Sequence, residues 1–249
     1  GVSALFRDYL AMGSGAGDAV RQWFGAEPFS KTWMGSAPAA SHADELADLL
    51  ERQNTAFGAG VAAFDNIGKL RAGAQAVVTG QQVVLFGGPL MVLLKAATAI
   101  ARAKAATAET GVQHVPVFWM ATEDHDLDEV DQVALLTKNA VETLRVGLKA
   151  SGAPVGGVVP GAEMDAVLEQ AAELLGHAPV SEWLRECYGA GGGVRPSLAL
   201  AFGRLMARIF AAEGLIVMDA STREFHALGA RTLRYAIEHA EELQQALMA

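Results

Sequence analysis

The sequence is poor in cysteine, in aromatic side chains and in positive charge. Its single cysteine, Cys187, excludes an internal disulfide and a structural zinc site built from several cysteines. The 19 lysines and arginines are outnumbered by 28 acidic residues, which gives a formal net charge of −9. Proteins that bind nucleic acids normally carry a basic surface, so this balance predicts no nucleic-acid partner. We interpret Cys187 as a packed, unreactive thiol, because its helical segment contains no catalytic motif.

The sequence also has no recognisable membrane anchor or export signal. Residues 1–10 lack the charged region, apolar core and small-residue cleavage site of a signal peptide. The uncharged run 76–94 is interrupted by two glutamines, two glycines and a proline, which makes it a poor membrane span. Hydrophobic residues make up 51% of the chain, enough for a substantial core. We therefore expect a soluble, cytoplasmic protein with no membrane partner.

Residues 76–107 contain a strand, a glycine-rich turn and a helix, and the rest of the chain is arranged around them. The β-branched run 76–79 predicts a strand that is buried on both faces and ends at Gly80. Two adjacent amides, Gln81 and Gln82, follow the strand. Because glycine leaves the backbone open to close approach, this region is a candidate binding loop.

The turn Gly87-Gly88-Pro89 predicts the start of a helix, because proline suits the first helical turn. From Leu90 onward, apolar residues keep helical spacing and predict one buried face, made of positions 90, 93, 94, 97, 100 and 101. The free N–H groups at the helix start carry partial positive charge, which favours a carboxylate or a phosphate. The alternative is a tight turn without a ligand.

Strands alternate with helices along the remaining chain. Residues 115–121 and 215–219 each have the pattern of a buried strand, and helices are predicted on either side of them. This alternation is typical of an α/β fold with a parallel sheet and crossover helices. The other predicted elements are one or two helices at 41–72, β runs at 132–137 and 141–148, helices at 162–175, 179–188 and 197–213, and a long helix from Thr222 to the end.

Three polar segments follow predicted strands. They are the turn after Thr79, an acidic cluster after Thr122, and the loop after Asp219. Ligands of open parallel sheets bind beyond the carboxyl ends of the strands, so all three segments should meet on one rim. Asp219 also suits a cap for the helix that follows it.

The acidic cluster consists of Glu123, Asp124, His125 and Asp126. His125 is a candidate general acid or base, because an imidazole with a pKa of about 6.5 can be oriented by a neighbouring carboxylate. Two alternatives remain open. The cluster either holds a divalent metal ion, although no His-Glu-x-x-His spacing supports one, or forms a structural helix cap. We retain the prediction of a site without a metal.

The other ionisable residues receive structural interpretations. Lys95 shares a helix face with Met91, Thr98 and Arg102, and we interpret it as part of a solvated stripe. Three histidines outside the acidic cluster have no partner pattern and are interpreted as structural, namely His114, His177 and His226.

Two motifs carry a resemblance to a known family. The first is Val78-Thr79-Gly80-Gln81-Gln82 followed by Leu85-Phe86-Gly87-Gly88-Pro89-Leu90. The second is Val117-Phe118-Trp119-Met120-Ala121-Thr122-Glu123-Asp124-His125-Asp126. Two later segments, 201–206 and 214–219, continue in the family's order. Together they resemble the cysteine-adding enzymes of bacillithiol biosynthesis, which are cysteine ligases.

The resemblance implies a Rossmann-like core with inserted segments. In this interpretation, residues 1–72 form an N-terminal arm and helices packed on the core, and residues 73–221 form the core, with an insertion around 137–195. Residues 222–249 begin a helical coiled coil, through which the full-length enzyme forms a homodimer.

The resemblance also implies a reaction. Cysteine is joined to glucosaminyl-malate through an amide bond on the sugar amine, so the partners are small-molecule substrates. ATP is expected from the fold rather than from a motif. Carried over by position, His125, Asp124 and Asp126 are catalytic. The implied substrate-binding residues are Thr79, Gly80, Gln81, Gln82, Gly87, Gly88 and Glu123. The alternative is a non-catalytic fragment or a small-anion or nucleotide-binding module of the same fold.

The chain departs from the family in two respects. Val83-Val84 stands where the family usually has Pro-Gly, which predicts a differently shaped loop. Family members are also much longer, and this chain ends in what resembles the first helix of the coiled coil. We therefore expect the chain to correspond to the N-terminal part of the enzyme, which lacks activity on its own if the missing half completes the site.

Overall fold

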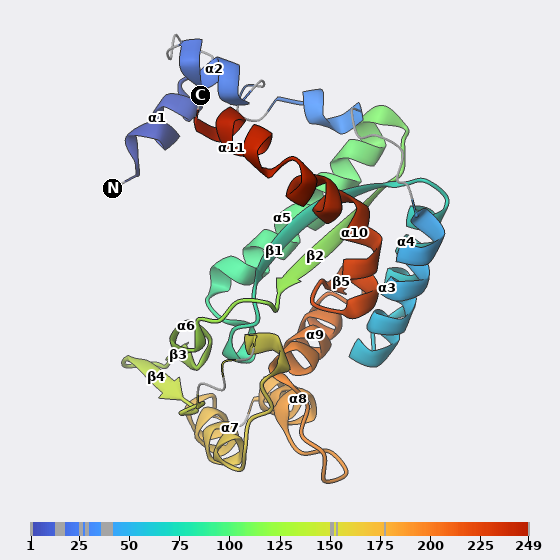
Figure 1. Cartoon of the computed structure of the whole chain (residues 1–249). Coiled ribbons are helices and arrows are strands. Elements are labelled where there is room, and N and C mark those ends of the chain that lie inside the picture. The colour runs from blue at the N-terminus through green and yellow to red at the C-terminus, as the bar shows by residue number, and fades with distance from the viewer. Residues whose placement is uncertain are drawn as a thin grey trace.

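The centre of the molecule is a parallel three-stranded sheet (Figure 1). The structure is a computed structural model that describes residues 2–12, 18–24, 27, 30–35, 42–149, 152, 154–176 and 178–248. The strands lie in the order β1-β2-β5 and pair in parallel. Their bounds are Gln75–Gln82 for β1, His114–Ala121 for β2 and Ile216–Asp219 for β5. The predicted α/β fold with crossover helices is confirmed.

Helices cover both faces of the sheet. α5 (Leu90–Thr110) and α9 (Leu198–Ile209) pack on one face, and α3 (Ala43–Phe57) and α4 (Val61–Arg71) pack on the other. Alternate residues of β2 point to opposite faces, as the pleat of a strand requires. Phe118 and Met120 therefore belong to the first core, and Val115 and Val117 to the second.

β1 differs from its prediction in two respects. The strand does not end at Gly80 but continues to Gln82, which pairs with Ala121 of β2. It is also not buried on both faces, since the side chain of Val78 is 55% exposed. The reason is position, because β1 forms an edge of the described sheet while α3 and α4 contact β2 and β5. A β-branched run therefore did not mark a central strand.

The buried face of α5 is also not the predicted one. Leu90 and Leu94 are exposed, whereas the buried positions are mostly alanines: Val92, Ala96, Ala99, Ile100, Ala103 and Ala106. Small side chains let the helix approach the sheet closely, so the larger residues point outward. Gly111 ends the helix in a left-handed conformation with φ of 72°, as expected for a C-terminal glycine.

Two side-chain amides of α3 complete the outer edge of β5. Asn54 is fully buried, donates to the carbonyl oxygen of Val217 at 2.9 Å and accepts from the N–H of Val217 at 3.1 Å. Gln53 makes the same pair of bonds with the backbone of Asp219, at 2.7 and 3.1 Å. The amides thus replace the hydrogen bonds that a neighbouring strand would make, which satisfies buried backbone groups.

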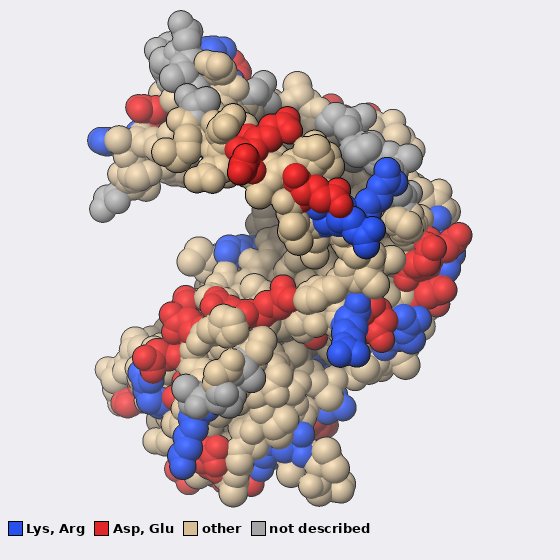
Figure 2. All heavy atoms as spheres, viewed as in Figure 1, with Lys and Arg blue, Asp and Glu red and all other residues tan. Residues whose placement is uncertain are grey.

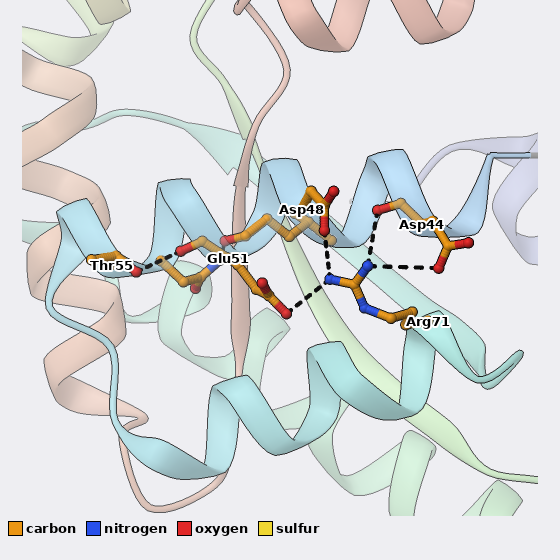
Figure 3. Close-up of polar contacts among 7 residues, drawn as sticks. Asp44, Asp48, Glu51, Thr55 and Arg71 are labelled. Carbon is orange, nitrogen blue, oxygen red and sulfur yellow. Dashed lines mark hydrogen bonds and ion pairs between the residues drawn. The ribbon is translucent and has the colours of Figure 1, made fainter.

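An arginine joins α3 and α4 on the surface. Arg71 of α4 points at three carboxylates of α3 (Figure 3). Its guanidinium nitrogens lie 2.7 Å from Asp48, 3.0 Å from Glu51 and 3.6 Å from Asp44. These hydrogen bonds, the strongest of them to Asp48, raise the pKa of Arg71. The carboxylates are solvent-exposed, so the network orients the two helices more than it stabilises them.

The segment between β2 and β5 forms a second core. A two-stranded antiparallel sheet, β3 and β4, packs with two helices, α7 and α8, against α9. Cys187 is buried in this core, and burial raises the pKa of its thiol to about 11, which agrees with the predicted packed thiol. The elements are α6 (Leu127–Val130), β3 (Gln132–Leu136), β4 (Val141–Arg145), η4 (Val155–Gly157), α7 (Glu163–Leu174) and α8 (Pro179–Tyr188).

The C-terminal helix is interrupted at His239. The predicted single helix from Thr222 is instead α10 (Arg223–Glu238) and α11 (Ala240–Met248), neither of which buries a described residue. In the N-terminal part, Lys31 pairs with Glu109 of α5 at 2.7 Å. The elements there are α1 (Ala4–Leu10), α2 (Asp18–Phe24) and η2 (Thr32–Gly35), and η3 (Leu85–Gly87) precedes α5. None of the described helices is both long and apolar enough to span a membrane.

Candidate functional site

The carboxyl ends of the three parallel strands meet on one rim, as the sequence predicted. Gln82 at the end of β1 lies beside Ala121 at the end of β2, and Met120 lies beside Asp219 of β5. In the space-filling view, acidic side chains form a red band along the lower wall of a hollow (Figure 2). This band follows the loop after β2 and α6, where Figure 1 places the strand ends.

The two glutamines of β1 form a relay of hydrogen bonds across this rim. The ammonium group of Lys95 donates to Oε1 of Gln81 at 2.7 Å, and Nε2 of Gln81 donates to Oε1 of Gln82 at 3.0 Å. Nε2 of Gln82 then donates to Asp124 at 2.5 Å and to Glu129 at 2.8 Å. Lysine can only donate and a carboxylate can only accept, so the two ends fix the orientation of both amides.

Asp124 organises the loop after β2. Its Oδ2 accepts from Gln82, and its Oδ1 accepts from the backbone N–H groups of His125 at 2.7 Å and Asp126 at 3.2 Å. The hydrogen bond from Gln82, followed by those from the two backbone N–H groups, holds the pKa of Asp124 below its usual value. The carboxylate is therefore ionised at neutral pH and presents a fixed negative charge at the rim.

The 3₁₀ turn η4 also holds the loop after β2 through hydrogen bonds. The N–H of Val155 donates to the carbonyl oxygen of Asp124 at 2.7 Å, and the N–H of Gly156 donates to that of Thr122 at 2.9 Å. A Cβ at position 156 would lie 2.5 Å from Cβ of Thr122, so only glycine allows this approach. The loop that carries Asp124 is thus held on both sides.

The third strand, β5, places one carboxylate on the rim, that of Asp219. Its Oδ1 accepts from the hydroxyl of the buried Thr122 at 2.6 Å, and from the N–H and hydroxyl of Ser221 at 3.0 and 2.8 Å. Asp219 does not cap the following helix, because Thr222 is the N-cap of α10 and accepts from the N–H of Phe225. Its carboxylate instead ties the end of β5 to the end of β2.

The outer members of the acidic cluster have separate contacts. Glu123 lies 2.7 Å from Nε2 of His226 on α10, in an exposed pair. Asp126 accepts from the N–H of Glu129 at 3.1 Å and is the N-cap of α6, which matches the helix-cap alternative for this residue. The exposed imidazole of His125 makes no hydrogen bond to any described residue, so neither neighbouring carboxylate orients it as the sequence suggested.

The predicted glycines have structural reasons for their identity. A Cβ at Gly80 would lie 2.6 Å from the carbonyl oxygen of Trp119 in β2. Gly87 and Gly88 have φ of 85° and 67°, and a Cβ at Gly88 would lie 2.2 Å from Cγ2 of Val84. Their N–H groups already donate to the carbonyl oxygens of Val84 and Leu85. Val83 and Val84, where the family usually has Pro-Gly, are buried in the core.

The structure therefore brings only some of the predicted residues together. Gln81, Gln82, Glu123, Asp124, His125 and Asp126 lie on the rim around the relay. Gly87 and Gly88 belong to a turn whose neighbour Phe86 packs edge-on against Tyr188 of the second core, with ring centroids 5.1 Å apart. Thr79 lines a cavity of about 340 Å³ between β1 and α5, which Lys95 also lines. A role for each of them in binding remains a prediction.

Three residues of the rim were not predicted from the sequence. Lys95 was interpreted as solvated but binds Gln81, Glu129 binds Gln82, and His226 binds Glu123. Their positions could have indicated a place on the rim. Glu129 follows the end of β2, and His226 lies in the first turn of the helix that follows β5. Among the described residues, no group of three or more His, Cys, Asp or Glu side chains has an arrangement suited to a metal ion.

Comparisons with known proteins place these features in a family. The model of the family described as "Bacillithiol biosynthesis BshC, N-terminal Rossmann-like domain" matches residues 2–249. A relative from Koribacter versatilis, named "Putative cysteine ligase BshC", is 43% identical over 208 residues. Relatives of the same name from Shouchella clausii and Symbiobacterium thermophilum are 32% and 33% identical. These alignments cover 82% of this chain but only 38–39% of each relative.

Proposed function

The chain belongs to the BshC family as its N-terminal Rossmann-like domain, and on this premise we propose that it is the N-terminal part of a ligase that adds cysteine to glucosaminyl-malate. The reaction forms an amide bond between the cysteine carboxyl carbon and the sugar amine, which gives bacillithiol. The chain spans about 38% of the length of the relatives it matches, so the proposed activity is that of the longer enzyme.

The observation that carries the proposal is the relay that ends on Asp124 and Glu129. An amine attacks a carboxyl carbon only as the neutral base, and it loses a proton as the C–N bond forms. Two carboxylates held by one amide group, Gln82, offer acceptors for the N–H groups of the amine and fix its direction of approach. His125, exposed beside them, accepts the released proton.

Amide formation from a free carboxylate needs activation of that carboxylate, and we propose ATP as the source. The N-terminus of α5 has no side-chain cap and no acidic residue in its first turn, which suits a phosphate group. Lys95, in the next turn, would supply a positive charge near the same end of the helix. ATP would provide the leaving group, whereas the residues of the rim orient the amine.

The test requires a complete enzyme. We would replace the matching part of the Koribacter versatilis relative with residues 42–248 of this chain and supply cysteine and glucosaminyl-malate, with and without ATP. Product would be followed by mass spectrometry. Bacillithiol formation that depends on ATP supports the proposal. A folded chimera that forms no product, while the unmodified relative does, would contradict it.

We also propose that residues 222–249 begin a coiled coil that makes the cytoplasmic full-length enzyme a homodimer. The support is two exposed apolar pairs, each four residues apart on its helix: Leu233 and Ile237 on α10, and Leu243 and Leu247 on α11. Such apolar pairs normally pack against another helix. Sedimentation of the chimera and of a variant with Leu233→Lys and Ile237→Lys would test this, since a dimer that survives both charges would contradict the assignment.

A further inference from the structure

The relay across the rim begins at a cation and ends at two anions. Lys95 lies in the second turn of α5, whereas Asp124 and Glu129 follow the end of β2. Gln81 and Gln82 join these groups, because each amide accepts from one neighbour and donates to the next. The relay therefore has a direction, in which every donor points away from the lysine and toward the carboxylates.

The packing of α5 directs Lys95 toward the end of β1. Val92 and Ala99, three residues before and four residues after the lysine, are buried, so Lys95 lies at the border of the buried face. Side chains of a helix lean toward its N-terminus, and α5 begins close to the end of β1, after η3. The half-buried lysine thus runs along the helix, and its ammonium group reaches Gln81 at 2.7 Å.

Gln81 depends on this lysine for its position. Among the described residues, its side chain has two hydrogen bonds, one from Lys95 and one to Gln82. β1 is an edge strand, so no described strand beyond it constrains the amide from the outer side. Gln82 is held in addition by both carboxylates. Lys95 therefore anchors the end of the relay that strand pairing leaves open.

A positive charge at the start of such a chain strengthens the hydrogen bonds that follow it. Four members of the relay are half-buried, namely Lys95, Gln81, Gln82 and Asp124. Water therefore screens their dipoles less than it does at an open surface. The ammonium group polarises the amide of Gln81, which becomes a stronger donor to Gln82, and Gln82 in turn becomes a stronger donor to the carboxylates.

We propose that Lys95 is a positioning residue of the rim. It acts through the two glutamines on the carboxylates of Asp124 and Glu129, while its own hydrogen bond is made to Gln81. This role rests on the ligase function proposed above, because those carboxylates are the groups that receive the amine. It is distinct from the positive charge that the lysine offers to a phosphate group.

The first test is a ¹³C NMR titration of the Asp124 carboxyl carbon in this chain, which needs no substrate. Lys95→Met keeps a long side chain without the charge. It is expected to raise the pKa of Asp124, because the hydrogen bond from Gln82 weakens. The control is Lys104→Met, which changes an exposed lysine of the same helix and should leave the titration as it is. An unchanged Asp124 titration in Lys95→Met would overturn the proposal.

A double-mutant cycle separates the relay from a direct attraction between the two charges. Gln81→Leu keeps Lys95 and breaks the relay between it and Asp124, and neither substitution alters the backbone pairing of β1 with β2. If the relay carries the effect, Gln81→Leu alone raises the pKa of Asp124, and Lys95→Met adds nothing in that background. If Lys95→Met has the same effect in both backgrounds, the charge acts through space and the relay has no part in it.

The second test uses the chimera at saturating ATP and cysteine, where a contact of the lysine with phosphate does not limit the rate. Lys95→Met is expected to lower kcat/KM for glucosaminyl-malate roughly fivefold relative to Lys104→Met, because the carboxylates lose part of their fixed orientation. Equal values for the two variants would contradict the positioning role. A chimera that makes no product overturns the ligase function instead, and the NMR titrations still decide whether the relay acts on Asp124.

Discussion

The side-chain nitrogen of Gln82 lies 2.5 Å from Oδ2 of Asp124, and this contact joins the ends of two neighbouring parallel strands through side chains. The bond is charge-assisted, because the acceptor is an ionised carboxylate. It also sets the direction of the amide, whose oxygen faces Gln81.

Replacing Gln82 by leucine is expected to raise the pKa of Asp124. The hydrogen bond from Gln82 is the largest cause of its lowered pKa, and its loss destabilises the charged form. The measurement is ¹³C NMR titration of the Asp124 carboxyl carbon in both proteins. Because the folded pKa is lowered, the carboxylate contributes stability above its ordinary pKa of about 3.9, and this contribution is lost as the pH falls through the folded value. An unchanged Asp124 titration in the leucine variant contradicts the assignment.

The same substitution is expected to slow product formation in the chimera at least roughly tenfold, because the two carboxylates lose the group that positions them. The matched control is Gln170→Leu, which changes an exposed glutamine of α7. Rates would be compared at saturating cysteine and glucosaminyl-malate. Equal rates for Gln82→Leu and Gln170→Leu would show that the relay has no role in the reaction.

Asn54→Leu is expected to destabilise the fold by about 2–6 kcal/mol, because it orphans the buried N–H and C=O of Val217 at about 1–3 kcal/mol each. Urea unfolding followed by circular dichroism gives the value. The control is Thr55→Val in the next position of α3, whose exposed hydroxyl donates only to Glu51, with an expected change within ~0.5 kcal/mol. Similar losses for both variants would show that the edge of β5 does not need the amide.

Gly88→Ala is expected to cost more stability than Gly147→Ala. Both glycines have positive φ, 67° and 80°, and such a conformation costs a residue with a side chain about 1–3 kcal/mol. Gly88 also has ψ of −157°, a conformation that is essentially restricted to glycine. At position 88 the new Cβ in addition meets a neighbour, Cγ2 of Val84 at 2.2 Å, which adds about 1–3 kcal/mol of overpacking. Thermal unfolding of the two variants measures the sum of these two differences. Equal costs would show that the turn before α5 has room for a side chain.

Cys187 is expected to make stability fall with rising alkaline pH. Burial raises its pKa from 9.0 to about 11 in the folded state. Between these values the unfolded chain loses the thiol proton and the folded chain keeps it, so the free energy of unfolding decreases through this window. Urea midpoints measured across it in the natural chain and in Cys187→Ala give the comparison. The alanine variant is less stable throughout but has a flatter slope, and parallel curves would contradict the prediction.

The elements that the sequence predicted well are those whose environment matches their local pattern. Apart from Trp119, which is 39% exposed, β2 and β5 are largely buried on both faces, so continuous apolar runs at 115–121 and 215–219 identified them. Their parallel arrangement then placed Thr122 and Asp219 on one rim, where the two side chains bond directly. Neither inference required knowledge of side-chain direction.

The wrong predictions share one physical cause. The direction in which a side chain points depends on neighbours that are distant in the sequence. Lys95 was assigned to solvent because its helical neighbours are polar, yet it faces Gln81 at the end of an edge strand. The buried face of α5 is lined mainly by alanine, so a pattern weighted toward leucine selected the exposed side. The imidazole of His125 lacks the expected carboxylate partner because Asp124 binds backbone N–H groups instead.

The amides of Gln53 and Asn54 give the sheet two unlike borders. On the β5 side the backbone groups are already occupied by side chains of α3, so that border cannot recruit another strand without first displacing a buried helix. On the β1 side no described strand other than β2 pairs with residues 75–82, so the outer edge of β1 has no described partner strand. Growth of the sheet, whether by further chain or by unwanted self-association, is thereby restricted to one direction, beside Val77 and Val78 and next to Lys95.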